Sequence, residues 1–135
     1  MSVIKDVIVL NDDNTLSFGN YEVADKQKVE FEANGNLYKV RTHKDVTRLS
    51  KNTQLLLETV PGAAVHNLKV NEKEVTFSIE GNGGTQVTLE LESDSHYTIY
   101  IDDVSIGNIE TNFAGKISFG MELNSVPKFV KIEKR

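Results

Sequence analysis

The sequence predicts an all-β protein, and three observations lead to that fold class. Apolar and polar residues alternate in short runs along the chain, as Val87, Leu89 and Leu91 do with the polar residues between them. Clusters of Asn, Asp and Gly separate these runs at the spacing of a sandwich or barrel. No window of useful length shows the helical period of about 3.6 residues. We therefore expect an antiparallel β-sandwich of about ten to twelve short strands, with a closed β-barrel as the alternative.

The N-terminal part of the chain contains a buried-strand signal and an irregular strand. Residues 7–10 form a continuous apolar run, which favours a strand buried on both faces. The Asn and Asp residues at 11–14 then turn the chain, because both types tolerate turn conformations. The apolar alternation of residues 16–23 changes phase at Gly19, which predicts a β-bulge at that point.

A hairpin and two further strands follow. Residues 29–40 alternate on both sides of an Asn-Gly pair at 34–35, which is typical of a hairpin with a type I′ turn. Residues 46–49 are short and polar, and they predict an edge strand or one turn of helix. The apolar residues 55–57 belong to a strand that ends at Pro61.

The second half of the chain alternates more regularly. Its predicted strands are residues 68–70, 75–79, 87–91, 97–101, 104–109, 117–123 and 130–132. Asp102 and Asp103 are expected to form a two-residue hairpin turn, and residues 81–84 a glycine-rich loop, since glycine tolerates positive φ. We expect residues 46–49 and 129–132 to be edge strands, because the Lys and Arg residues beside them discourage uncontrolled pairing.

Length and composition predict a single domain that spans residues 1–135. The chain is 39% hydrophobic and 26% charged, which is ordinary for a globular protein. It contains no cysteine, which excludes disulfides, thiol nucleophiles and cysteine metal sites. The absence of cysteine does not decide the cellular compartment.

The charge balance limits the classes of partner. The protein is acidic, with a net charge of −5 and an isoelectric point near 5.2, and no basic run stands out in the sequence. We therefore expect no nucleic-acid partner. The longest apolar run is far shorter than a membrane span, and the first residues lack the order of a signal peptide. Localisation stays unknown at this point.

No sequence motif identifies a catalytic residue. His43, His66 and His96 lack the spacing of a zinc pair, and we expect all three to be surface or rim residues. No nucleophile elbow, phosphate loop or dinucleotide fingerprint is present. We predict no catalytic residues and lean against an enzyme. The alternative is a small hydrolase or lyase with an unrecognised acidic site, since any two of the twenty acidic residues can meet in space.

Oxygen-rich loops leave calcium as the one open cofactor. Residues 11–14 and 92–95 are rich in carboxylate, amide and hydroxyl oxygens, which calcium prefers. Asp12 and Asp13 are the candidate ligands. The calcium-loop motif is missing, however, and turn formation explains both segments. We therefore expect no cofactor, with calcium at Asp12 and Asp13 as the alternative.

Exposed aromatic residues are the candidates for a sugar-binding face, because sugars stack on exposed rings. The chain has no Trp, so Tyr and Phe supply them. Tyr100 points away from Tyr97, so one of the two lies on an outer face. Tyr21, Tyr38 and Phe113 complete the candidate set, with Phe113 in a loop.

Residues 97–119 have the order Tyr-x-Ile-x-Ile-Asp, then Gly, then Thr-Asn-x-x-Gly-Lys-Ile-Ser-Phe. This order, with residues 58–81 upstream, resembles the C-terminal immunoglobulin-like and fibronectin-like β-sandwich modules of bacterial polysaccharide-active secreted proteins. Asp103 departs from the pattern, which commonly has Gly after the hairpin Asp. The resemblance implies a bacterial module without catalytic residues, secreted or at the cell surface. Without it, a cytoplasmic location is the expectation.

The glycine-rich segment at residues 81–84 supports a second resemblance. Its order looks like the G-x-G-G loop of chagasin-type cysteine-protease inhibitors, which makes Asn82 and Gly83 candidate binding residues. The other inhibitory loops of that family are missing from this chain.

Together these observations predict a non-catalytic β-sandwich module that acts by binding or assembly. Its partner would be a protein or a polysaccharide, and a homo-oligomer built through a sheet face or edge is expected. The small hydrolase or lyase and the chagasin-like inhibitor are the alternatives.

Overall fold

The computed structural model describes residues 8–22, 27–33 and 35–135, and within them it contains strands and no helix. The strands are β1 (Ile8–Leu10), β2 (Leu16–Phe18), β3 (Gln27–Ala33), β4 (Asn36–Thr42), β5 (Thr47–Lys51), β6 (Gln54–Val60), β7 (Ala63–Val70), β8 (Glu74–Gly81), β9 (Gly83–Glu90), β10 (His96–Ile101), β11 (Val104–Glu110), β12 (Lys116–Leu123) and β13 (Lys128–Lys134). The predicted all-β class is confirmed. No helix in the described part of the chain has the length and apolarity to cross a membrane.

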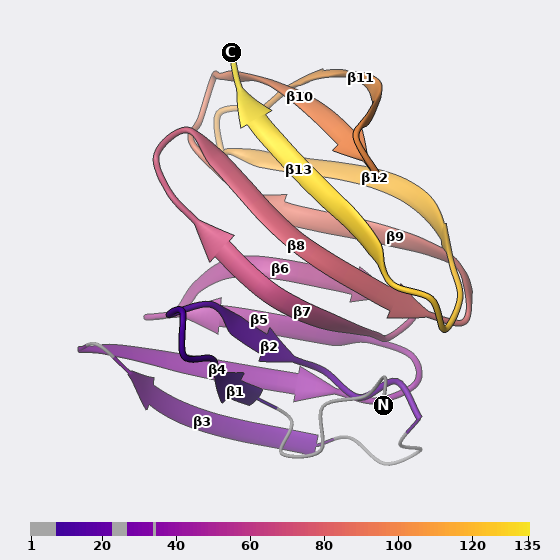
Figure 1. Ribbon diagram of the computed structural model, residues 1–135. Coiled ribbons are helices and arrows are strands. Elements are labelled where there is room, and N and C mark those ends of the chain that lie inside the picture. The colour runs from indigo at the N-terminus through magenta and orange to yellow at the C-terminus, as the bar shows by residue number, and fades with distance from the viewer. Residues whose placement is uncertain (1–7, 23–26, 34) are drawn as a thin grey trace.

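The strands form two antiparallel sheets that pack face to face (Figure 1). The seven-stranded sheet has the order β1-β2-β7-β8-β13-β10-β11, and the six-stranded sheet has the order β12-β9-β6-β5-β4-β3. Each sheet keeps two edges among the described residues, so the sandwich prediction is confirmed and the closed-barrel alternative is wrong. The last strand, β13, lies between β8 and β10, next to strands far from it in the sequence.

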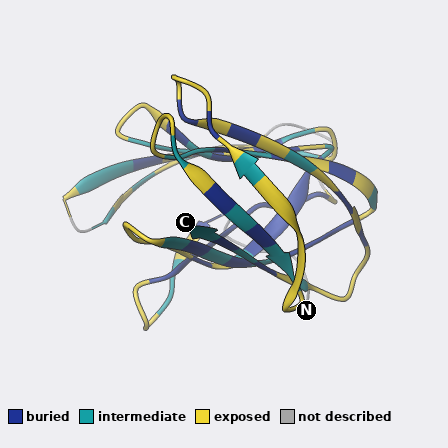
Figure 2. Ribbon diagram, turned by 90° about the horizontal axis from the view of Figure 1, so that it is seen from above, coloured by how far each residue is buried: buried dark blue, intermediate teal, exposed yellow. Residues whose placement is uncertain are grey.

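The core lies between the sheets and draws on both. Period-two alternation places apolar residues of each strand on its inner face, so buried and exposed residues alternate along the ribbons (Figure 2). The largest fully buried side chains are Phe18, Phe77, Leu49, Leu57, Ile79, Leu89 and Ile132. Each such side chain stabilises the fold by about 1.5–3 kcal/mol relative to its exposed state.

The predicted hairpins are present. Asp102 and Asp103 have φ values of 50° and 67°, as a type I′ turn between β10 and β11 requires. Ala33 pairs with Asn36 across the β3–β4 hairpin, and Gly35 has a φ of 79°. Asn34 lies outside the described residues.

Two predictions for the N-terminal strands are wrong. β1 is an edge strand with Ile8 buried and Val9 exposed, so it is not covered on both faces. β2 ends at Phe18, and Gly19, with a φ of 100°, takes the chain out of the sheet instead of forming a bulge. Tyr21 therefore continues no strand. Residue 23 lies outside the described part.

Both predicted edge strands are central. β5 pairs with β4 and β6, and β13 pairs with β8 and β10. The true edges among the described strands are β1, β11, β12 and β3. Flanking Lys and Arg residues did not identify an edge, because the exposed face of a central strand accepts charges equally well. The glycine-rich loop is also shorter than predicted, since only Asn82 separates β8 from β9.

Candidate functional site

Two of the four candidate aromatic rings are inaccessible. Tyr38 is 9% exposed and contributes to the core, and Tyr21 is 5% exposed. Neither offers a free ring face to a sugar. The prediction that both rings are exposed is therefore wrong. Tyr21 lies in the segment after β2, and Tyr38 faces the opposite sheet.

The other two aromatic candidates are accessible but lie on different elements. Tyr100 is half-buried on the outer face of the seven-stranded sheet, with Lys131 Nζ 5.7 Å from its ring centroid. Hydrogen bonding to Glu133 and the charge of that carboxylate raise the pKa of Lys131. Phe113 is 87% exposed in the loop between β11 and β12. These positions do not form the shared stacking platform that the candidate set requires.

The remaining predicted residues occupy turns. Asn82 and Gly83 form the tight β8–β9 connection. Asp12 and Asp13 lie in the β1–β2 turn, where Asp13 Oδ1 accepts hydrogen bonds from Thr15 Oγ1 (2.6 Å) and Thr15 N (3.1 Å). These hydrogen bonds lower the pKa of Asp13. The described residues contain no group of three or more His, Cys, Asp or Glu side chains placed to hold a metal ion.

The sequence pattern did not predict a buried polar cluster that Tyr21, His66 and Glu80 form. Glu80 is completely buried, although its position in an alternating strand predicts a solvent-facing side chain. His66 Nε2 lies 2.7 Å from its Oε1, and Tyr21 Oη donates to its Oε2 over 3.1 Å. His66 keeps 20% of its side chain exposed and is the most accessible of the three side chains.

The cluster connects the segment after β2 to strands β7 and β8. Tyr21 belongs to the segment after β2, His66 to β7 and Glu80 to β8, so the three side chains fasten that segment to the outer face of the seven-stranded sheet. Both carboxyl oxygens of Glu80 have a partner, as a buried polar group requires. No local pattern in β7 or β8 indicates that Glu80 is buried, because the segment that covers it comes from elsewhere in the chain.

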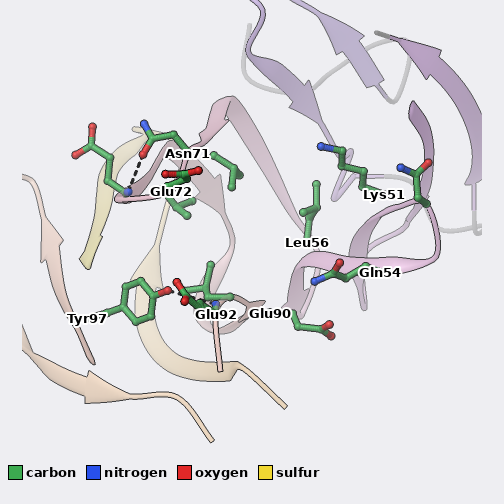
Figure 3. Close-up of a pocket in the computed structure, with 13 residues that line it drawn as sticks. Lys51, Gln54, Leu56, Asn71, Glu72, Glu90, Glu92 and Tyr97 are labelled. Carbon is green, nitrogen blue, oxygen red and sulfur yellow. Dashed lines mark hydrogen bonds between the residues drawn. The ribbon is translucent and has the colours of Figure 1, made fainter. Parts of the chain in front are cut away.

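An acidic cleft of about 430 Å³ lies between the ends of the two sheets (Figure 3). Glu72 and Glu74 approach it from the β7–β8 connection and Glu90 and Glu92 from the end of β9. Tyr97 lies beside Glu92 in the cleft, with its hydroxyl accepting the Glu92 N–H at 3.3 Å.

Lysines balance part of this acidic charge. Lys134 Nζ contacts the Glu92 carboxylate, and this hydrogen bond raises the pKa of Lys134. Lys131 Nζ lies 3.8 Å from Glu74. Solvent screens exposed ion pairs of this kind, so they contribute little to stability. The carboxylates of the cleft are therefore exposed to solvent and partly neutralised by these lysines.

The least protected edge of the sandwich is β11. Six of its seven residues are exposed and only Ile109 is half-buried. Val104 is 64% exposed and Ile106 is 49% exposed. A strand exposed along its length, with free main-chain groups on one side, is a template for pairing with another strand.

The other edges carry the usual protection. β3 presents Lys28, Glu30 and Glu32, and β1 has only three residues. β12 buries alternate residues and carries Lys116 and a glutamate. In β11 the one charged residue is at its end. Among the edge strands of seven or more described residues, β11 therefore has the fewest charged side chains.

Apolar residues on the inner face of the seven-stranded sheet continue from β10 to the edge strand β11. Ile99 is buried, Ile101 is half-buried, and Val104, which pairs with Ile101, is exposed. On the opposite sheet, Phe119 of β12 is also half-buried. The sandwich is therefore incompletely closed along this side.

The sequence pattern predicted the strand β11, but it did not predict that this strand is exposed. Its alternation resembles that of covered strands, and the position of a strand within a sheet depends on pairing between distant segments. Comparisons of the chain with protein-family models, with curated proteins and with solved structures gave no match.

Proposed function

We propose that this protein is a non-catalytic assembly module that pairs with a second copy of itself through β11. The observation that carries this proposal is the exposure of β11 along an open sheet edge. Adding a strand there extends the seven-stranded sheet across the two copies. Main-chain hydrogen bonds then supply affinity, and side chains supply specificity.

The main chain of β11 has groups that point outward. Arg135 donates its N–H to the carbonyl of His96, so the main chain of His96 faces β13. Glu110 lies opposite His96, and its N–H and C=O therefore point away from β10. By the same alternation those of Asn108 also point outward, because Ile109 between them pairs inward with Tyr97.

The side chains of β11 suit an antiparallel copy of the same strand. Pairing centred on Ile109 places Glu110 opposite Asn108, so the outward main-chain groups of the two copies meet and the only charge of the strand does not face its own copy. Like charges directly opposite would destabilise such a pair, and this arrangement avoids them.

An irregularity in β11 restricts which strands can join it. The register with β10 shifts between Ile99 and Tyr100, so Ile106 has no partner in that strand. Gly107 beside it has a φ of 145°. A bulge increases the local twist, and a partner must match that twist to pair along the whole strand. A second copy of β11 carries the same bulge.

The substitution Ile106→Lys tests the proposal. We expect it to weaken self-association at least about tenfold, equal to about 1.4 kcal/mol, by placing a charge in the pairing surface. Sedimentation velocity over a concentration series measures the change. Val60→Lys is the matched control, because Val60 is 52% exposed and lies in the six-stranded sheet. Equal association of the two variants would contradict the proposal.

A further inference from the structure

The outer face of the six-stranded sheet carries three cations in one row. Lys28 of β3 lies directly opposite Arg41 of β4, and Arg41 lies directly opposite Arg48 of β5. All three side chains are exposed. Lys39 of β4 lies two residues from Arg41 on the same face. The residues of this row are far apart in the sequence, so no basic run revealed it.

This arrangement is unfavourable without an anion. Like charges directly opposite on neighbouring strands repel. Arg48 is neutralised in part by Glu58, whose carboxylate lies 3.0 Å from its Nη1. Within the described residues, Lys28 and Arg41 have no carboxylate within ion-pair distance.

The row borders a shallow hollow of about 570 Å³. Ser50 contributes a hydroxyl beside Arg48, and Glu30 contributes one carboxylate opposite Lys39. The hollow and its neighbour Glu58 together carry four cations and two carboxylates, a local excess of positive charge on a protein whose net charge is −5.

From this row we infer that the outer face of β3, β4 and β5 binds an acidic polysaccharide. Neighbouring strands lie about 4.8 Å apart, so the row presents cations at a regular repeat across the sheet. A sugar chain that bears a carboxylate on each residue supplies anions at a comparable, regular repeat. The forked guanidinium of Arg41 suits a carboxylate, because it can donate two parallel hydrogen bonds.

An acidic peptide fits this face less well than a sugar chain. β4 and β5 are central strands whose main-chain groups pair on both sides. A peptide therefore finds no free main chain for strand addition here, and recognition depends on side chains alone. This site is separate from β11, which belongs to the other sheet.

Titration calorimetry with polygalacturonate tests the inference, with a neutral glucan as the comparison. We expect binding of polygalacturonate alone, and weaker binding as salt increases, since salt screens exposed charges. Arg41→Gln should reduce the affinity at least about tenfold. Lys116→Gln is the control, because Lys116 is exposed on β12 at the far edge of the same sheet.

Three results would overturn the inference. They are equal binding of polygalacturonate and the neutral glucan, equal effects of Arg41→Gln and Lys116→Gln, and binding of polyglutamate as tight as that of polygalacturonate. Circular dichroism and thermal unfolding check that both variants are folded. Sedimentation of the Arg41→Gln variant separates this site from self-association, which it should leave unchanged.

Discussion

At the scale of single residues, the completely buried Glu80 is the position where the sequence pattern misleads most. Alternation in β8 assigns it correctly to the outer face of its sheet, but that face is covered at this point by Tyr21. The covering segment enters from elsewhere in the chain, and strand periodicity carries no information about it. A buried carboxylate needs partners, so its stability depends on His66 and Tyr21.

Replacing His66 tests this dependence. His66→Ala leaves the buried carboxylate of Glu80 with one fewer partner, and we expect the free energy of unfolding to fall by about 3 kcal/mol. Urea denaturation at pH 7 measures it. Ser78→Ala is the control, because Ser78 lies opposite His66 in the sheet register and should change stability by at most about 0.5 kcal/mol. Equal losses in the two variants would show that the cluster does not stabilise the fold.

Asp13 gives a prediction about pH. The side-chain and backbone hydrogen bonds from Thr15 lower its pKa in the folded protein. The unfolded chain therefore binds more protons in acid, and the contribution of Asp13 is fully present above its unfolded pKa of about 3.9 and lost as the pH falls through the folded value. Asp13→Asn should destabilise the protein more at pH 7 than at about pH 2.5.

Urea denaturation at both pH values measures this difference. Asp12→Asn controls for a change of charge in the same turn, because the hydrogen bonds of Thr15 go to Asp13. A loss of stability in Asp13→Asn that is the same at both pH values would contradict the assignment.

At the scale of elements, the connections between strands are set by backbone conformation and by contact with neighbouring strands. Gly115, between β11 and β12, has a φ of 78°, and its N–H donates to the Asn112 carbonyl. A Cβ at Gly115 would collide with the carbonyl oxygen of Leu91. Gly35 has nearly the same φ, 79°, but a Cβ there would meet open space. Comparing substitutions at the two glycines therefore distinguishes the cost of a steric collision from the cost of backbone strain.

Substitution of both glycines tests that separation. Gly35→Ala should cost about 1 kcal/mol, from the left-handed backbone alone. Gly115→Ala should cost more, about 3 kcal/mol, because the main chain at Leu91, just after β9, must also move. Thermal unfolding of the two variants measures the difference. Equal costs would contradict the tight approach of Gly115 to β9.

At the scale of the whole molecule, the sequence was sufficient for the fold class and insufficient for the order of strands. Alternation and turn residues located the strands at residues 87–91 and 117–123 and the turn at Asp102 and Asp103. They did not reveal that β13 is central or that β11 is an open edge, because pairing between distant strands has no local signal. The row from Lys28 to Arg48 was missed for the same reason.

Amide hydrogen exchange at Asn108 and Glu110 tests assembly through β11 most directly. Their N–H groups point away from β10, so they should exchange rapidly in dilute protein. Pairing with a second β11 should protect both amides as the protein concentration rises, while Ile109, already paired with Tyr97, changes little. Rapid exchange at Asn108 and Glu110 at every concentration would contradict assembly through β11.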